Sequence, residues 1–305
     1  MAGEKVSIIG LGALGILFGQ HLSKKMPPQN LRIIADQERI KRYETEQVYS
    51  NGERCHFQYV TPEEAVEPAD LIIIAVKESG LKDALHAIHR HVGEDTVILS
   101  ALNGITSEER VAERYGWDKV LYCIAYGMDA VKEGNELTYA NMGKLAFGDI
   151  DPDGVSDQVK RIARFFDETD FPYEIDTNMK KRMWGKFMVN VGVNQTVAVY
   201  RGNYGTIQKD GEARDRMVRA MKEVIALSEW EGATLTDEDL HYWLAVLGTL
   251  NPEGKPSMAQ DLEAKRFSEV ELFAGTVLRL ASKHNIPTPV NRSFYEEVMR
   301  IESGY

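Results

Sequence analysis

The chain has 305 residues, of which 43% are hydrophobic and 27% are charged, as in a globular protein of one large or two ordinary domains. Its formal charge of −11 disfavours nonspecific nucleic-acid binding. The most apolar run, residues 71–76, is far shorter than the roughly 20 residues that span a bilayer. The N-terminus lacks a signal-peptide pattern, and neither Cys55 nor Cys123 lies in a C-x-x-C pair. We therefore expect no membrane or nucleic-acid partner and a reducing, cytoplasmic location.

In the first half of the chain, apolar segments alternate with helical patterns. Buried strands are predicted at 6–10, 31–35, 71–76, 96–100 and 120–125, with a helix at 13–25. Asn51-Gly52 predicts a two-residue hairpin turn, and Thr61-Pro-Glu-Glu64 predicts a capping box that opens a helix. Such strands with helices between them favour a parallel sheet covered on both faces.

Beyond residue 177 the pattern is helical almost throughout. The periodicity predicts helices at about 178–200, 210–232, 236–249 and 258–284. We therefore expect two domains, 1–177 and 178–305, that pack closely around a cleft.

A glycine-rich motif follows the first predicted strand and opens the first predicted helix. It has the form G-x-G-x-x-G, and its members are Gly10, Leu11, Gly12, Ala13, Leu14 and Gly15. Glycine permits a tight turn and a close approach of the backbone to a diphosphate, which the helix N-terminus attracts. The alternative is a strand-to-helix turn without a ligand.

Charged residues follow the second predicted strand. Asp36 stands about 20 residues beyond the glycines, where an acidic side chain binds the ribose 2′-hydroxyl of NAD. Arg39, Lys41 and Arg42 come next and could instead hold the 2′-phosphate of NADP. A solvated helix start would also explain all four residues. The pattern leaves NAD and NADP open.

Two polar residues follow later strands. Lys77 comes directly after the strand at 71–76, and Asn103 follows the strand at 96–100. The carboxyl ends of parallel strands face the ligand in open α/β sheets, so both residues are candidates for the site. The alternatives are a surface lysine entering a loop and an ordinary Asn103-Gly104 turn.

The segment 183–200 is apolar almost all round, which is typical of a buried helix. Lys186, Asn190 and Asn194 interrupt it at spacings of four and therefore lie on one face. A buried lysine with two amides needs a partner. Either the three form a structural network between helices, or the lysine is a charge clamp and proton donor opposite a nicotinamide.

Weaker signals lie elsewhere in the chain. Ser257 and Gln260 form a capping box, which would explain both residues without a ligand. Glu269 begins an apolar stretch and is otherwise an exposed helix glutamate. His86, His89 and His91 crowd one predicted helix without a carboxylate or cysteine companion, so no metal site is expected.

Together these segments resemble the ketopantoate reductase (2-dehydropantoate 2-reductase) family, within the 6-phosphogluconate dehydrogenase-like superfamily. The resemblance covers nearly all 305 residues, and its most specific part is the order and spacing of the blocks at 184–194 and 257–269. It implies an α/β Rossmann NAD(P)-binding domain over 1–177. An all-α domain for substrate binding and homodimerisation follows over 178–305, with the active site between the domains.

The resemblance also implies roles for individual residues. Gly10 to Gly15 would hold the pyrophosphate, and Lys77 and Asn103 would lie near the nicotinamide ribose and the substrate. The backbone at Ala130 would meet the cofactor. Lys186 would be the general acid, and Glu269 would contact the cofactor or position the lysine. The 2-oxo acid would be held by Asn190, Asn194 and Ser257.

The implied activity is reduction of ketopantoate to pantoate by NADPH, in pantothenate and coenzyme A synthesis. NADH stays open, because Asp36 stands where many family members carry a basic residue. The alternatives are a reductase of another small 2-oxo acid and a non-catalytic NADP(H)-binding sensor. A small 2-oxo acid is the only partner expected besides a second copy of the chain.

Overall fold

The computed structural model describes residues 3–150 and 154–305. The chain forms two compact units, Met1–Met179 (unit 1) and Lys180–Tyr305 (unit 2). Among the residues that the structure describes, none of the helices has the length and apolarity that crossing a membrane requires.

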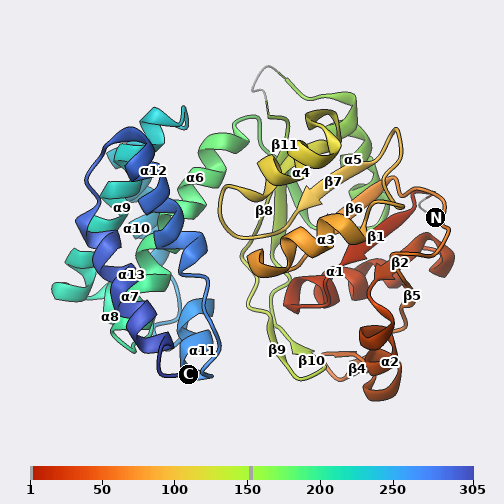
Figure 1. Cartoon of the computed structure of the whole chain (residues 1–305), viewed down its shortest axis with the longest axis horizontal. Coiled ribbons are helices and arrows are strands. Elements are labelled where there is room, and N and C mark those ends of the chain that lie inside the picture. Colours follow the sequence, from red (N-terminus) through yellow and green to blue (C-terminus); the bar gives the residue numbers. More distant parts are fainter. Residues whose placement is uncertain (1–2, 151–153) are drawn as a thin grey trace. The chain divides into compact units, whose positions relative to one another are not determined.

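Unit 1 is built on an eight-stranded sheet in the order β12-β11-β8-β7-β6-β1-β2-β5 (Figure 1). The strands are β1 (Val6–Ile9), β2 (Leu31–Ile34), β5 (Gln58–Val60), β6 (Leu71–Ile74), β7 (Val97–Ser100), β8 (Val120–Tyr126), β11 (Lys144–Gly148) and β12 (Tyr173–Ile175). The five apolar segments are confirmed as strands. These five strands pair in parallel, as expected, and β11, which was not predicted, runs antiparallel to β8.

Alternation along the strands divides the core of unit 1 into two layers. Leu71 and Ile73 of β6 pack with α1 (Ala13–Ser23) and α5 (Asp157–Glu168). Ile72 and Ile74 of the same strand face the opposite layer. That layer contains α3 (Leu81–Ala87) and α4 (Ser107–Tyr115). Helices therefore cover both faces, which explains why the central strands are apolar without interruption.

A smaller sheet accompanies the large one, in the order β4-β3-β10-β9. Its strands are β3 (Tyr49–Ser50), β4 (Glu53–Arg54), β9 (Val131–Glu133) and β10 (Glu136–Thr138). The predicted hairpin turn is confirmed, with Asn51 at φ 50° and Gly52 at φ 76° between antiparallel strands. The helix predicted after Thr61 is wrong. Thr61 N–H does donate to Glu64 Oε1 at 2.8 Å, but only a turn follows, and Pro68 disfavours helical geometry at the residue before it.

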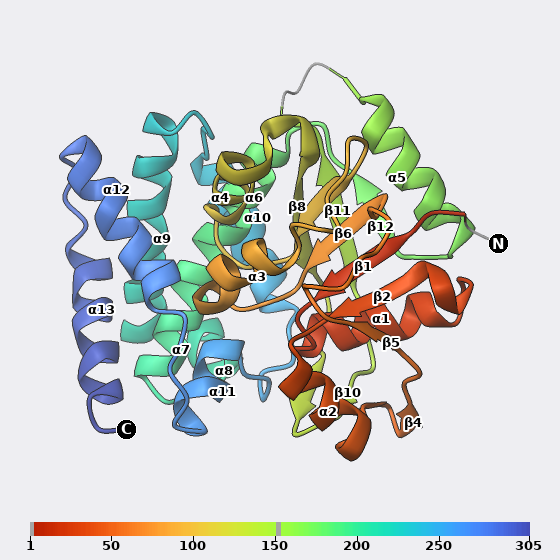
Figure 2. The same ribbon diagram turned by 45° about the vertical axis from the view of Figure 1, so that its right-hand side comes forward.

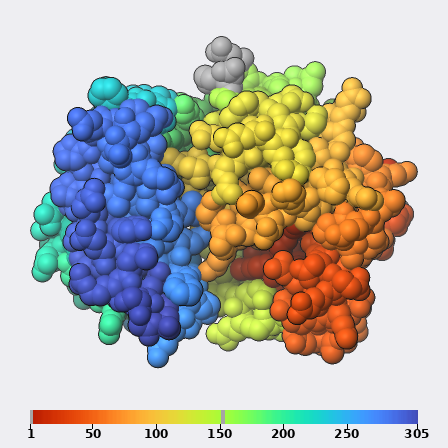
Figure 3. Space-filling model, in the orientation of Figure 1, coloured from red at the N-terminus to blue at the C-terminus, as the bar shows by residue number. Residues whose placement is uncertain are grey.

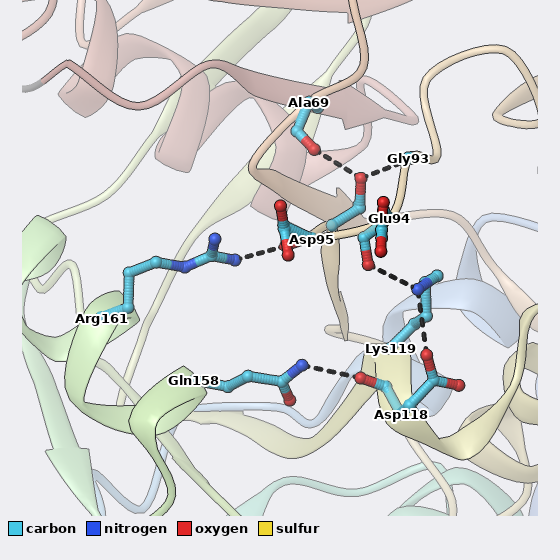
Figure 4. A network of polar contacts seen from close by, with 9 residues as sticks. Ala69, Gly93, Glu94, Asp95, Asp118, Lys119, Gln158 and Arg161 are labelled. Atoms are coloured by element: carbon cyan, nitrogen blue, oxygen red, sulfur yellow. Dashed lines mark hydrogen bonds and ion pairs between the residues drawn. The ribbon is translucent and has the colours of Figure 1, made fainter.

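The loops at the amino ends of β7 and β8 are tied to α5 (Figure 4). Arg161 donates to the carbonyl of Asp95 at 2.6 Å, and Gln158 donates to the carbonyl of Asp118 at 2.7 Å. Lys119 bridges the two loops through the carbonyl of Glu94, at 2.7 Å. These contacts fix the end of the sheet opposite to its carboxyl edge. Short helices connect other elements of unit 1: η1 (Pro28–Asn30), η2 (Glu78–Gly80), η3 (Trp117–Lys119) and α2 (Gln37–Glu46).

Unit 2 is helical (Figure 2). Its chain begins within α6 (Met179–Val189) and continues through the π-helical turn η4 (Asn190–Asn194), α7 (Gln195–Val199), α8 (Tyr204–Gln208), α9 (Glu212–Trp230), α10 (Asp237–Gly248), α11 (Ser257–Glu263), the π-helical turn η5 (Glu271–Gly275), α12 (Thr276–His284) and α13 (Pro289–Glu302). The helices predicted near 178–200, 210–232 and 236–249 are confirmed. Helices α8 and α13 were not predicted.

The single helix predicted over 258–284 is wrong, because the chain leaves the helix after Glu263. Lys265 has φ 52°, and Arg266 N–H donates to the carbonyl of Asp261 at 2.8 Å. The Arg266 side chain also pairs with the buried Asp261 carboxylate, Nε to Oδ1 at 2.8 Å. Local contacts therefore end α11, and a second helical segment begins only near Glu271.

Candidate active site

The glycine-rich motif forms the turn from β1 to α1, and two of its glycines are required by packing. Gly10 has φ 97°, and a Cβ there would lie 2.6 Å from the carbonyl oxygen of Ala75. A Cβ on Gly15 would lie 1.8 Å from the carbonyl oxygen of Gly10. The loop after β1 thus lies directly against the loop after β6.

Gly12 is different, because the protein's own packing leaves it room. A Cβ there would lie 3.7 Å from the Ala75 carbonyl oxygen, which is an ordinary contact. Gly12 is exposed and is the N-cap of α1, and the first helical turn contains no acidic residue. Free N–H groups at an uncrowded helix N-terminus fit a diphosphate. In the space-filling view, dark red atoms of the N-terminal segment lie at the bottom of a recess between orange atoms (Figure 3).

Two further predicted residues follow β6, which neighbours β1, and β7, which neighbours β6. Strands β1, β6 and β7 are parallel neighbours, so their carboxyl ends lie at one edge of the sheet. Lys77 follows β6 and is the N-cap of η2, and Asn103 follows β7 just before Gly104, which has φ 92°. Lys77 is exposed, and Asn103 is partly buried. Ala130 lies beyond the end of β8 and packs partly buried against the core. The structure therefore places these residues after the carboxyl ends of adjacent strands.

Asp36 and Arg39 interact with each other at the start of α2. The Asp36 carboxylate is the N-cap and accepts the N–H of Arg39 at 2.8 Å. Its second oxygen lies 3.4 Å from Arg39 Nε. Both residues therefore have a structural role at the start of α2. Their side chains are nevertheless exposed just after β2, where the ribose was predicted to bind.

Lys186 and the two asparagines lie along α6 and the π-helical turn that continues it. The helix is less buried than expected, because Lys186 and Asn190 are only partly buried while Asn194 is buried. The two amides contact each other, with Asn194 Nδ2 donating to Asn190 Oδ1 at 3.3 Å. The change from α to π geometry thus occurs within this candidate site.

Ser257 joins the same cluster. Its hydroxyl donates to Asn194 Oδ1 at 3.4 Å, and the N–H of Met258 reaches the same oxygen at 3.4 Å. The predicted capping box is wrong: Pro256 is the N-cap of α11, and Gln260 donates instead to the carbonyl of Lys255 at 3.0 Å. The explanation of Ser257 by capping alone therefore fails, and the structure brings Asn190, Asn194 and Ser257 together.

Glu269 lies just before the second π-helical turn. It is partly buried, and its carbonyl accepts the N–H of Phe273 at 3.1 Å. The two π-helical turns, η4 and η5, contact each other. Each π-helical turn of unit 2 therefore lies at a predicted site residue: η4 contains Asn190 and Asn194, and η5 begins two residues after Glu269.

The three histidines do not share a helix. Only His86 lies on α3, which ends at Ala87. His91 is fully buried and contacts the Ser7 hydroxyl through Nδ1 at 2.8 Å; burial lowers its pKa to about 4. Within the described parts of the chain, no three His, Cys, Asp or Glu side chains gather as metal ligands would.

Two structural features of unit 2 were not predicted. One is the pair of π-helical turns, for which the sequence gives no periodic signal beyond the asparagines themselves. The other is Asn291, a fully buried side chain that contacts Gln195 from 96 residues away. A polar residue in the first turn of a helix is ordinary, so its sequence context provided no signal.

The fold and the glycine turn define a Rossmann-type dinucleotide-binding unit followed by a helical unit. Two family models match the chain: "Ketopantoate reductase PanE/ApbA" over residues 6–152 and its C-terminal counterpart over residues 178–302. The chain belongs to the ketopantoate reductase family, a family of oxidoreductases that use a nicotinamide nucleotide.

Several individual relatives are distant but match over almost their whole length. The 2-dehydropantoate 2-reductase of Aquifex aeolicus is 27% identical over 297 residues, which are 94% of this chain and 93% of that protein. The structure of a dimeric ketopantoate reductase from Staphylococcus aureus matches with a TM-score of 0.82 at 20% identity, covering 98% and 99% of the two chains. A D-mandelate dehydrogenase solved with NADH and anilino(oxo)acetate has a TM-score of 0.86 at 22% identity and covers 98% of both chains. The structural likenesses support the fold.

Proposed function

We propose that this protein reduces 2-dehydropantoate to pantoate with NADPH. The observation that carries the proposal is the contact of Asn190 and Ser257 with Asn194. Lys186 lies about one helical turn before Asn190, on α6, which runs directly into η4. A sensor would need only the nucleotide-binding unit, whereas this chain also holds three neutral polar groups beside a lysine.

The chemistry assigned to these side chains is as follows. A nicotinamide nucleotide held at the glycine turn would supply the hydride for C2 of the acid. Negative charge then develops on the ketone oxygen, where the Lys186 ammonium stabilises it and donates a proton. Asn190, Asn194 and Ser257 orient the acid without adding charge, and Glu269 positions the lysine or contacts the nucleotide. Lys77, Asn103 and the backbone at Ala130 hold the nicotinamide end of the cofactor.

The cofactor assignment rests on the residues around the ribose. Gly10, Gly12 and Gly15 form the diphosphate turn, and Arg39 would hold the 2′-phosphate of NADPH. Asp36 opposes that phosphate and favours NADH. The family resemblance favours NADPH. The preference for NADPH over NADH in variants of Asp36 and Arg39 is therefore the quantity to be measured.

The remaining proposals follow from the same assignment. The reaction would belong to pantothenate and coenzyme A synthesis in the cytoplasm. Unit 2 would form a homodimer, which the dimeric Staphylococcus aureus relative supports.

An absorbance assay at the nicotinamide band tests the function. Purified protein is mixed with ketopantoate and NADPH or NADH, with pyruvate, 2-oxoisovalerate and phenylglyoxylate as controls. The expected result is rapid oxidation of NADPH with ketopantoate alone. Turnover of a control acid alone would move the activity to another 2-oxo acid, an alternative that the fold shared with D-mandelate dehydrogenase permits. Tight NADPH binding without turnover of any acid would support the sensor.

The role of Lys186 has its own test. Lys186→Ala should lower kcat by about 10²- to 10⁴-fold, the usual contribution of a general acid, while the Kd for NADPH stays within about twofold. Lys222→Ala, at an exposed position of α9, is the matched control and should leave both quantities unchanged. A Lys186→Ala protein that loses NADPH affinity but turns over normally when saturated would contradict the assignment.

A further inference from the structure

A chain of buried side-chain hydrogen bonds runs through unit 2 behind the two site asparagines. Gln195 Nε2 donates to Asn291 Oδ1 at 3.1 Å, and Asn291 Nδ2 donates to Glu223 Oε2 at 2.7 Å. Gln195 and Asn291 are both completely buried. These hydrogen bonds join α7 and α9 to α13, which lies far from both in the sequence. Buried polar groups of this kind are costly unless their partners are in place.

The first member of this chain supports the π-helical turn directly. In a regular α-helix the N–H of residue 195 would bond to the carbonyl of Val191. Here that N–H donates to the carbonyl of Gly192 instead. The carbonyl of Val191 accepts Gln195 Nε2, at 2.8 Å. The side chain therefore satisfies a buried carbonyl at the point where the backbone departs from α geometry.

The second member orients the first. Asn291 donates both to the Ala220 carbonyl, at 3.2 Å, and to Glu223, so its oxygen must face Gln195. Glu223 is held in turn by the N–H groups of Val290 and Asn291, at 2.8 and 3.0 Å. Asn291 therefore presents a fixed acceptor to Gln195, and Gln195 presents a fixed donor to the π-helical turn.

We propose that Gln195 and Asn291 are positioning residues that hold η4 in π geometry, so that Asn190 and Asn194 stay side by side for the substrate. The inference rests on the proposed function, in which these two amides bind the 2-oxo acid. Gln195 follows Asn194 directly in the chain, so a change in the turn moves the Asn194 amide first. Neither positioning residue needs to touch the substrate.

Gln195→Met tests the inference with an unbranched side chain of similar length that donates no hydrogen bond. The KM for ketopantoate should rise about tenfold or more, while the KM for the nucleotide stays within about twofold. The matched control is Thr196→Val at the next buried position. The Thr196 hydroxyl has no hydrogen-bond partner within the described residues, so its loss should leave both KM values unchanged.

A second measurement does not depend on activity. Amide hydrogen exchange should become at least tenfold faster at residues 190–195 in Gln195→Met than in the wild type, with little change in the middle of α9. If Gln195→Met does not fold, Asn291→Ala replaces it. That variant keeps the Gln195 amide but removes its acceptor, and a smaller rise in the KM for ketopantoate is then expected.

The outcomes separate the inference from the function beneath it. Wild-type protein that turns over ketopantoate, with no change in KM in Gln195→Met, overturns the positioning role. Equal rises in both KM values, or the same rise in Thr196→Val, also overturn it, because they indicate general loss of structure. Wild-type protein without turnover of ketopantoate overturns the proposed function. The exchange rates alone then decide whether the side-chain network holds the turn.

Discussion

Asp36 has two roles that a simple truncation would confuse. Its carboxylate caps α2, which is worth about 1 kcal/mol, and it also carries a negative charge beside Arg39. The pair is largely exposed, with 54% of the Asp36 side chain and 63% of the Arg39 side chain accessible, so the ion pair itself adds little stability. Asparagine caps helices about as well as aspartate, which allows the charge to be removed alone.

We predict that Asp36→Asn raises the ratio of kcat/KM for NADPH to that for NADH by about tenfold, or about 1.4 kcal/mol. The melting temperature should hardly change, because the cap remains. Arg39→Gln should move the ratio in the opposite direction. Steady-state kinetics with both nucleotides measure it. An unchanged ratio in Asp36→Asn would place the ribose elsewhere.

Gly12 permits a similar separation of binding from folding. Serine is at least as good an N-cap as glycine, and the packing around Gly12 leaves room for a Cβ. Gly12→Ser should therefore keep or raise the melting temperature while it weakens nucleotide binding at least tenfold, as titration calorimetry would show. Gly15→Ala, whose Cβ would overlap the Gly10 carbonyl, should instead disrupt folding of unit 1. Normal nucleotide affinity in Gly12→Ser would remove the diphosphate from this turn.

At the residue scale, the sequence predicted what is local. The glycine motif and the spacing of Asn190 and Asn194 are short-range patterns, and the structure shows the turn and the contact. The hydrogen bond from Ser257 to Asn194 spans 63 residues, and the bond from Gln195 to Asn291 spans 96. No local pattern encodes such pairs, because they depend on how the helices pack.

Among the elements, η4 owes its packing to a glycine. A Cβ on Gly192 would lie 2.4 Å from Met221 Cγ and 3.2 Å from Met217 Cγ, and both methionines are completely buried on α9. The absence of a side chain therefore lets α9 approach the turn closely. Such close approach is a common reason for glycine inside a helix.

We predict that Gly192→Ala destabilises the protein by about 1 to 3 kcal/mol, the usual cost of overpacking a core. Urea denaturation measures the loss. Gly248→Ala is the control, because Gly248 ends α10 and no described atom lies within 4 Å of a Cβ there. Its effect should be neutral or stabilising. In a double-mutant cycle, Met221→Ala should relieve part of the Gly192→Ala loss, and strict additivity would contradict the packing explanation.

The elements that sequence reasoning recovered are those with strong internal patterns. The apolar runs of the central sheet and the long helical periodicities identified most of both units. Strands β9, β10 and β12 are only three residues long and partly exposed, so hydrophobicity does not mark them. The end of α11 depends on Lys265 taking a left-handed conformation, which is rare for a lysine and could not be anticipated.

For the whole molecule, the buried His91 couples folding to pH. Burial is the main cause of its lowered pKa, with the charge of Arg32 second. The folded protein therefore keeps His91 neutral down to about pH 4, whereas the unfolded chain binds the proton near pH 6.5. Stability is highest above pH 6.5 and falls as the pH drops from 6.5 to about 4. Burial lowers the pKa of His21 as well, which adds a loss of the same sign.

We predict that the free energy of unfolding is about 2 kcal/mol smaller at pH 5 than at pH 7 on account of His91, from 1.36 kcal/mol per pH unit below 6.5. His91→Gln should remove most of this difference, and the exposed His89→Gln should retain it. Urea titrations at the two pH values provide the measurement. A pH dependence that is equal in wild type and His91→Gln would assign the effect to other groups.

The π-helical turn at Asn190–Asn194 also affects how the chain tolerates changes in length. A π-helical turn contains one residue more than a regular α-helical turn. That extra residue changes the angular position of the side chains after the turn by about 100° relative to those before it. Removing one residue there would leave an unbroken helix, yet everything from Gln195 onward would rotate about the axis relative to Lys186. A deletion that looks harmless by secondary structure alone would therefore turn the buried face of α7 away from its partners.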